Sequence, residues 1–216
     1  MIKNYFIFPI NPSKYLYSQY QGNKLKTFIF VLLITHLLLL IVSYMLPVIQ
    51  QDHVYSEAIT NVISNAYILL IVPIFEELIF RLPLRVTATN FSTSISIFIV
   101  SIIISLLGLL FSFKLTLFEF YSLSILFSFP VIVITKYYIY SEKIEQLLKK
   151  NYNILFYIGF SSFISAHFYY VDFNITNILT YTIYGHSLCF LRVTVSFYSC
   201  ILFHFILNFP VLLTML

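Results

Sequence analysis

Two adjacent carboxylates and a guanidinium interrupt an apolar run between Pro73 and Pro83, where the sequence reads Glu76, Glu77 and, four positions later, Arg81. Burying an ionised carboxylate without a partner is costly, so such groups inside a membrane are usually paired, protonated or next to water. Glu77 and Arg81 share one helix face and can form an ion pair. Glu76 points about 100° away from Glu77, which leaves its carboxylate to face another neighbour. The run therefore predicts a functional site inside a membrane.

Two further motifs place imidazole groups in apolar segments. Phe163 precedes His167 by four positions, so its ring can pack against the imidazole one helical turn later. His204 and Asn208 have the same spacing, which puts the imidazole and the carboxamide on one face. Both of these side chains can donate hydrogen bonds to a single oxygen atom.

Each of the three motifs also has a purely structural interpretation. The glutamates could neutralise nearby arginines at the membrane interface, the second motif could supply one interhelical hydrogen bond, and the third could be a polar seam between helices. For Glu76 and Glu77 we favour a functional role, because two carboxylates exceed what one ion pair needs.

The composition indicates an all-α, polytopic transmembrane helical bundle. Hydrophobic residues make up 60% of the 216-residue chain and charged residues only 9%, whereas soluble domains have about 25% charged residues. The apolar runs are continuous rather than alternating, which excludes a transmembrane barrel. Basic residues are scattered between these runs, so we expect no nucleic-acid partner; the expected surroundings are the lipid bilayer.

A spanning helix needs about 20 apolar residues, and we predict about seven such spans, with eight possible if the N-terminal arm folds back. The arm comprises residues 1–26 and is expected to be cytoplasmic or interfacial; residues 27–216 form a single transmembrane domain. Ser141–Asn153 is a polar, helix-prone linker between the two halves. The predicted spans are, in order, Phe28–Leu46, Ala58–Arg81, Ser94–Phe113, Leu117–Tyr140, Ile154–Tyr170, Ile175–Phe190 and Val193–Leu213.

Loop charges predict the orientation of the spans. Eleven of the twelve Lys and Arg residues fall on one side, including Arg192 between spans six and seven, and the positive-inside rule makes that side, with the N-terminus, cytoplasmic. No cleavage site follows the first apolar run, so it should remain as a span. The Phe, Ile, Tyr, Asn and Lys bias suggests an AT-rich genome, which fits a bacterium, so the expected location is a bacterial plasma membrane. Cys189 and Cys200 are expected to be small core residues rather than a disulfide.

Together the three motifs resemble those of the CPBP family, the CAAX-processing and bacteriocin-processing intramembrane proteases related to the Ras-converting endopeptidase. The family motifs EExxxR, FxxxH and HxxxN match residues 76–81, 163–167 and 204–208 in the same order. The resemblance covers residues 73–208. It implies a glutamic endopeptidase that cleaves a membrane-anchored peptide or protein.

The resemblance also implies a role for each matched residue. Glu76 and His167 would orient and deprotonate a water molecule, and His204 with Asn208 would stabilise the oxyanion. Glu77, Arg81 and Phe163 would support this geometry. The family has also been read as zinc-dependent, with Glu76, His167 and His204 as ligands; because no HExxH pair is present, we rank catalysis without a metal or other cofactor first.

Two departures from the family pattern favour an alternative function. Leu82 stands where the family usually has glycine, and 85 residues lie between Glu77 and Phe163. The alternative is a non-catalytic membrane protein of the same fold that acts in immunity or regulates a partner. A proton-coupled transporter ranks last, because the sequence lacks repeat symmetry and glycine-interrupted helices.

Overall fold

The computed structural model describes residues 1–16, 23–45, 71–112, 115, 117–167 and 174–215. Within these ranges the regular structure is entirely helical, as predicted, and contains no strand. The chain divides into two compact units. Unit 1 comprises Met1–Thr60 and Tyr152–His204, and unit 2 comprises Asn61–Asn151 and Phe205–Leu216.

Three of the described helices are long and apolar enough to cross a membrane. They are α3 (Lys24–Met45), α5 (Ala88–Phe111), and α6 (Leu117–Ile134) with its continuation η4 (Thr135–Ile139). They coincide with the first, third and fourth predicted spans. The second predicted span lies mostly outside the described residues; its last part, residues 71–81, is helical.

The second half of the chain folds into four further helices: α7 (Glu142–Lys150), α8 (Tyr152–His167), α9 (Ile175–Thr194) and α10 (Phe197–Met215). The linker predicted to be helix-prone forms α7, with the Ser141 side chain capping its first turn. α8 has 16 residues and covers most of predicted span five, whose last three residues, 168–170, lie outside the described residues. α9 is longer than predicted, with 20 residues.

The expected loop position of Arg192 is wrong. Arg192 lies in the last turn of α9 and is only 4% exposed, and the helix ends two residues later. Its guanidinium carbon lies 5.3 Å from the centre of the Phe197 ring, at the start of α10. A guanidinium can be accommodated there because its alkyl stem packs as an apolar group and the aromatic face attracts its charge.

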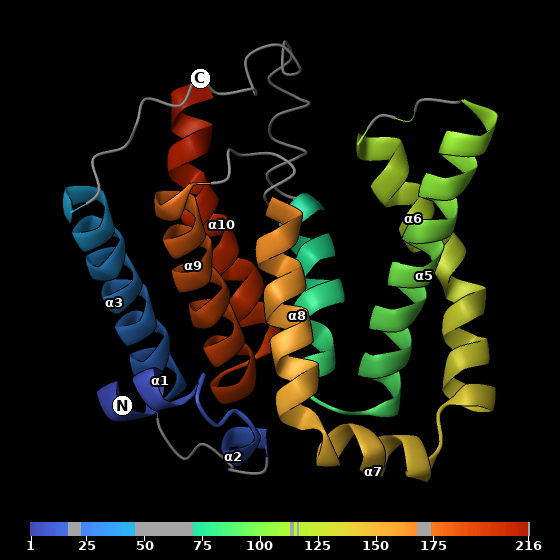
Figure 1. Cartoon of the computed structure of the whole chain (residues 1–216), viewed down its shortest axis with the longest axis horizontal. Helices are drawn as coiled ribbons and strands as arrows, with labels where there is room; N and C mark the ends of the chain where they lie inside the picture. The colour runs from blue at the N-terminus through green and yellow to red at the C-terminus, as the bar shows by residue number, and fades with distance from the viewer. Residues whose placement is uncertain (17–22, 46–70, 113–114, 116, 168–173, 216) are drawn as a thin grey trace. The chain divides into compact units, whose positions relative to one another are not determined.

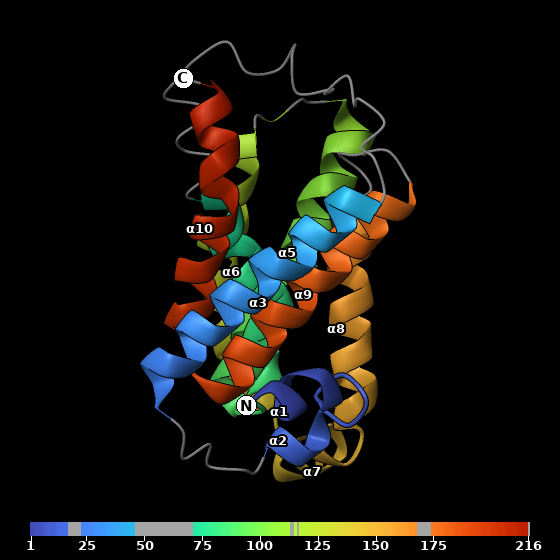
Figure 2. The same cartoon turned by 90° about the vertical axis from the view of Figure 1, so that its left-hand side faces the viewer.

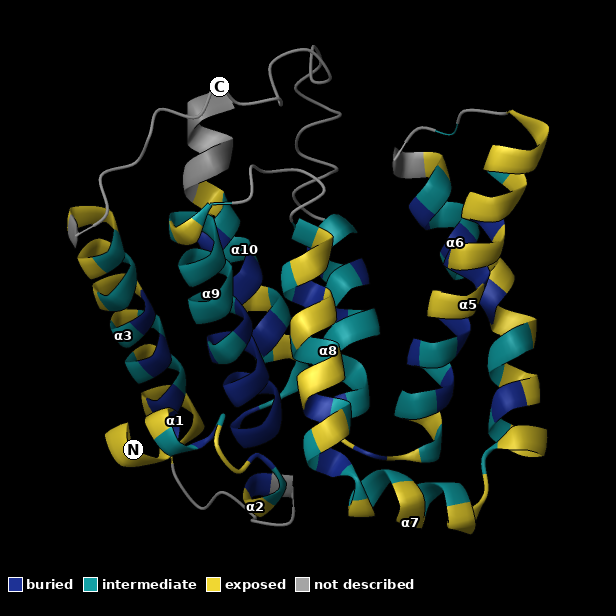
Figure 3. Cartoon of the chain, viewed as in Figure 1, coloured by how far each residue is buried: buried dark blue, intermediate teal, exposed yellow. Residues whose placement is uncertain are grey.

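α9 forms the centre of unit 1 and packs against α3 and α8 (Figures 1 and 2). The C-terminal half of α9 is almost continuously buried, as Figure 3 shows. Cys189 in this half and Cys200 in α10 are both free and buried, as predicted. The other buried apolar residues here include Leu188, Phe190, Leu191 and Phe203.

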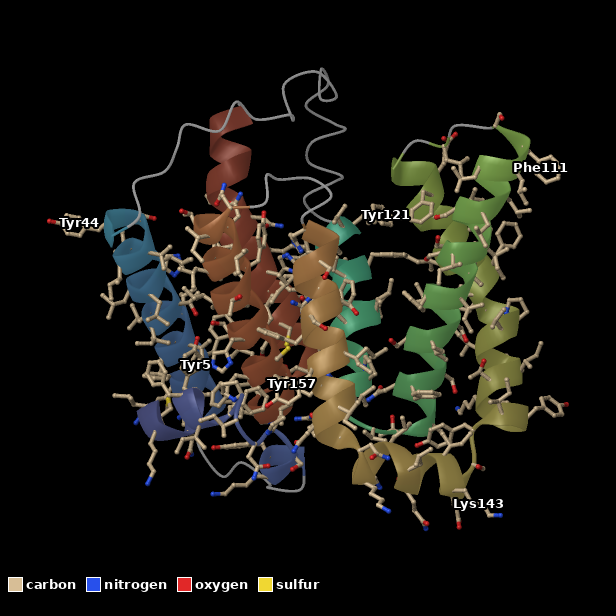
Figure 4. All side chains as sticks on the ribbon, viewed as in Figure 1. Tyr5, Tyr44, Phe111, Tyr121, Lys143 and Tyr157 are labelled. Carbon is tan, nitrogen blue, oxygen red and sulfur yellow. The ribbon has the colours of Figure 1, made fainter. Side chains whose placement is uncertain are left out.

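The N-terminal residues fold onto unit 1 through two short helices, α1 (Ile2–Ile7) and α2 (Ser13–Leu16). Tyr5 of α1, labelled in Figure 4, is fully buried. Its hydroxyl forms a 2.6 Å hydrogen bond with Ser187 of α9. The Ser187 hydroxyl also lies 2.6 Å from that of Thr35 in α3. Polar side chains thus connect α1, α3 and α9 in an apolar environment, where satisfying each hydroxyl is worth more than on a surface.

Unit 2 is built around α5 and α6, which run antiparallel next to each other (Figure 1). Small serine side chains are buried along both helices, and small residues allow helix backbones to approach closely in a membrane. Phe75, just before the first motif, packs with Ile97 of α5 and Tyr121 of α6 in one apolar cluster. The buried serines are Ser92, Ser94, Ser96 and Ser101 on α5 and Ser124 and Ser128 on α6.

Candidate functional site

The predicted ion pair of the first motif forms in unit 2. Arg81 Nη1 lies 3.2 Å from Glu77 Oε1, and both side chains are at most 1% exposed. Each charge offsets much of the desolvation cost of the other, and neither can be removed alone without leaving a buried charge. Arg81 is among the largest fully buried side chains of the described chain. The pair therefore fixes the helix turn that carries Glu76.

The backbone of this turn departs from an α-helix. Glu77–Arg81 form a single π-helical turn, η2, in which the Leu82 N–H donates to the Glu77 carbonyl. The chain then leaves through the short 3-10 helix η3 (Leu82–Leu84), which contains Pro83. Such π turns are frequently found at functional sites. The Ser94 hydroxyl of α5 donates a 2.7 Å hydrogen bond to the Ile79 carbonyl and anchors the turn.

Glu76 immediately precedes the π turn. Its side chain is half-buried, and its Oε2 atom is inaccessible to solvent. The ion pair in this turn joins Arg81 to Glu77 rather than to Glu76. The two adjacent carboxylates consequently have different environments, as the sequence predicts.

The second motif meets His204, the first residue of the third motif, in unit 1. Phe163 of α8 is 1% exposed, and its ring centre lies 4.3 Å from that of His167, as predicted for this spacing. The same ring lies 6.5 Å from His204 of α10 in an edge-on arrangement. One phenylalanine thus contacts both candidate imidazoles, although 37 positions separate them in the sequence.

The orientation of His167 follows from its backbone contact. Its Nδ1 lies 2.9 Å from the Phe163 carbonyl oxygen. A carbonyl only accepts hydrogen bonds, so Nδ1 donates the proton. In a neutral imidazole the other nitrogen, Nε2, then carries the lone pair. Nε2 is therefore the atom through which His167 can accept a proton.

Tyr181 of α9 also contacts His167. The two ring centres lie 4.3 Å apart at an angle of 37°. His167 thus packs against the rings of both Phe163 and Tyr181, which limits rotation of the imidazole. The sequence did not indicate this contact, because Tyr181 is one of 18 tyrosines and belongs to none of the three motifs.

Gly185 of α9 lets α8 and α9 approach closely next to the ring of Phe163. A Cβ atom added at Gly185 would lie 3.0 Å from both Phe160 Cε2 and Phe163 Cδ1. These are ring atoms of packed side chains, so the helices would have to separate or the rings would have to turn. The close approach of the two helices depends on the absence of a side chain here.

We therefore expect Gly185→Ala to reduce the free energy of unfolding by about 1 kcal/mol, since overpacking outweighs the gain in helix propensity. Unfolding of the purified protein in mixed detergent micelles, followed by circular dichroism, measures the change. Gly159→Ala, which adds the same methyl group to α8, is the matched control. If both substitutions stabilised the protein equally, the space next to Gly185 would be large enough for a methyl group and the prediction would be wrong.

His204 and Asn208 lie four residues apart on α10, as predicted. His204 is 6% exposed and belongs to unit 1, whereas Asn208 is half-buried and belongs to unit 2. The seven candidate residues are therefore divided between the units. Phe163, His167 and His204 belong to unit 1, and Glu76, Glu77, Arg81 and Asn208 belong to unit 2.

Comparison with known proteins gives no match. No protein-family model matches the chain, no curated protein is significantly similar to it, and no solved structure matches it significantly. The functional interpretation consequently rests on the three motifs and on their surroundings in each unit. Within either unit, the described residues contain no group of three His, Cys, Asp or Glu side chains that could hold a metal ion.

Proposed function

We propose that this chain is an intramembrane endopeptidase that hydrolyses a peptide bond of a membrane-anchored peptide or protein. The observation that carries the proposal is the contact of Phe163 with both His167 and His204. Two motifs from distant parts of the sequence thereby supply two imidazoles around one buried ring. A histidine serving only one helix–helix hydrogen bond does not require this arrangement.

The resemblance of their motifs to EExxxR and FxxxH supports the proposal that Glu76 and His167 both act on the attacking water molecule. The Nδ1 atom of His167 donates to its own helix, so in the proposed reaction its Nε2 atom orients the water. Glu76 accepts the proton as the water attacks the peptide carbonyl. His204 and Asn208 then donate hydrogen bonds to the oxygen on which negative charge develops.

The remaining residues of the first motif would hold the backbone next to Glu76 in place. The Glu77–Arg81 pair is buried and salt-bridged, so it fixes the turn after Glu76. Leu82, in place of the family's usual glycine, has φ −56° and ψ −43°. Any L-amino acid adopts this conformation without strain, so the replacement does not conflict with a catalytic role.

The proposal includes the finer topology: about seven spans, a cytoplasmic N-terminus and a bacterial plasma membrane. It is supported by the three described helices long and apolar enough to span and by the distribution of Lys and Arg. Reconstitution into liposomes with membrane-anchored fluorogenic peptides tests the activity. Cleavage products identified by mass spectrometry would support the proposal; no cleavage of any anchored peptide would favour the non-catalytic alternative.

Zinc dependence is the lower-ranked form of the proposal, with Glu76, His167 and His204 as ligands. If the two side chains activate water without a metal, we expect dialysis against EDTA and 1,10-phenanthroline to leave the cleavage rate unchanged within about twofold, since no Lewis acid is removed. The rate is measured in the liposome assay before and after treatment. Loss of cleavage that added Zn²⁺ restores, but Mg²⁺ does not, would select the zinc mechanism.

A further inference from the structure

α7 is a short helix with charge at both ends and no buried residue (Figure 3). Acidic residues occupy its first turn, and Lys149 and Lys150 occupy its last turn, which complements the helix dipole. Ser141 caps its N-terminus by accepting a hydrogen bond from the Ile144 N–H. These local features form the helix without help from a buried face.

The helix nevertheless has a distinct apolar face. Ile144, Leu147 and Leu148 follow the i, i+3, i+4 spacing that places residues on one side of a helix. Leu147 is 58% exposed within the described structure. Gln146 lies on the opposite, polar side. Ile144 and Leu148 are half-buried. A partly exposed apolar stripe on a helix without a buried residue indicates that something outside the described structure covers it.

The position of α7 in unit 2 indicates what covers the stripe. The candidate span of α6 and η4 ends at Ile139, three residues before α7 begins. Tyr137 and Tyr138 at the end of that span are 69% and 83% exposed, and tyrosines are enriched where a span meets the membrane interface. α7 runs across the direction of α6 in Figure 1. It therefore begins where the membrane surface is expected.

The charges of α7 fit a lipid surface. Lys143 and Lys150 lie seven residues apart, on the side of the apolar stripe next to Leu147. Lys143 projects away from the helix in Figure 4. Lysines in this position can place their stems along apolar surface and their ammonium groups among headgroup phosphates. The hydrogen bond from Lys149 lowers the pKa of the Glu145 carboxyl. The ammonium group of Lys149 therefore balances the negative charge of Glu145, which reduces its repulsion of anionic lipid.

We propose that α7 is a membrane-surface helix that lies in the interface of the bilayer, inserts Ile144, Leu147 and Leu148 among the lipids, and contacts anionic headgroups through Lys143 and Lys150. The partner is the lipid surface itself. This inference is independent of the proposed peptidase activity.

The chain contains no tryptophan, so a single introduced tryptophan reports its own surroundings. Leu147→Trp probes the apolar stripe, and Gln146→Trp on the polar side is the matched control. Each full-length variant is reconstituted into liposomes of phosphatidylcholine and phosphatidylglycerol. Emission maxima are recorded, together with quenching by brominated phosphatidylcholine and by acrylamide.

We expect the tryptophan at position 147 to emit at shorter wavelength and to be quenched by the brominated lipid several-fold more than the one at position 146. Acrylamide should show the reverse order. Lys143→Gln with Lys150→Gln should reduce lipid quenching at position 147 in the anionic liposomes more than in liposomes of phosphatidylcholine alone. Equal quenching at the two positions would overturn the proposal. So would a tryptophan at position 147 that neither quencher reaches, because protein would then cover the stripe.

Discussion

Glu76→Gln is expected to lower the rate of peptide cleavage by about 10³-fold or more, the scale of effect associated with a general base. Glutamine keeps the shape and one acceptor oxygen of the side chain but cannot accept the proton of the attacking water. The measurement is kcat/KM for a membrane-anchored fluorogenic peptide in liposomes, at equal amounts of inserted protein.

Glu76→Gln leaves the buried Glu77–Arg81 pair of this turn intact, so we expect the variant to fold and to insert into liposomes. Glu142→Gln, which removes an exposed carboxylate from α7, is the matched control and should cleave normally. Undiminished cleavage by Glu76→Gln would refute the catalytic role. If instead the cellular phenotype of a deletion strain is restored equally by both variants, the non-catalytic alternative is selected.

Combining Glu76→Gln with His167→Ala tests whether the two residues act as one unit. Groups that act on the same water molecule show strongly non-additive losses, so the double variant should cleave about as slowly as the slower single variant. Independent effects would instead multiply. A multiplied loss would contradict the proposed joint action of Glu76 and His167 and leave each with a separate role.

Contacts within one helical turn could be predicted from the sequence. The Glu77–Arg81 ion pair and the Phe163–His167 ring contact are both present at the predicted spacing. Four-residue separation fixes the relative position of two side chains as soon as the segment is helical. The long apolar helices α3, α5 and α6 could also be predicted, because the length and the continuous hydrophobicity of a span are properties of the segment alone.

Contacts between helices could not be predicted in the same way. Nothing near Tyr181 in the sequence indicates that it meets His167, and nothing near Tyr5 indicates a hydrogen bond to Ser187. Both contacts depend on which helices become neighbours and on their rotation about their own axes. Arg192 shows a related limit: a charge suggests a loop, but the side chain is buried against Phe197.

The π turn at Glu77–Arg81 could not be predicted from the sequence either. A regular α-helix through the motif would satisfy the spacing equally well, and the sequence contains no signal for the wider turn apart from Pro83 shortly after it. The turn is supported by a tertiary contact, the hydrogen bond from Ser94 of α5 to the Ile79 carbonyl. The local conformation at the candidate site is therefore set partly by a helix that the motif does not include.

Arg81→Met is expected to lower the free energy of unfolding by about 3–5 kcal/mol, the second large effect that the structure predicts. Methionine fills much of the arginine's volume but leaves the Glu77 carboxylate buried without its cation. The loss is measured by unfolding in mixed detergent micelles at neutral pH. A matched control is Lys149→Met on α7, which breaks a Glu–Lys pair of the same four-residue spacing at a site about one third exposed; its effect should lie within the scatter of the measurement.

Adding Glu77→Leu to Arg81→Met should restore most of the lost stability, because both buried charges are then absent and the side chains are of similar size. This double variant separates the two purposes that a buried ion pair can serve. If the pair only stabilises the fold, the restored protein should cleave peptide normally. We expect it to remain impaired by at least tenfold in kcat with KM little changed, since the pair orients the turn that carries Glu76; normal cleavage by the restored protein would assign Glu77 and Arg81 to stability alone.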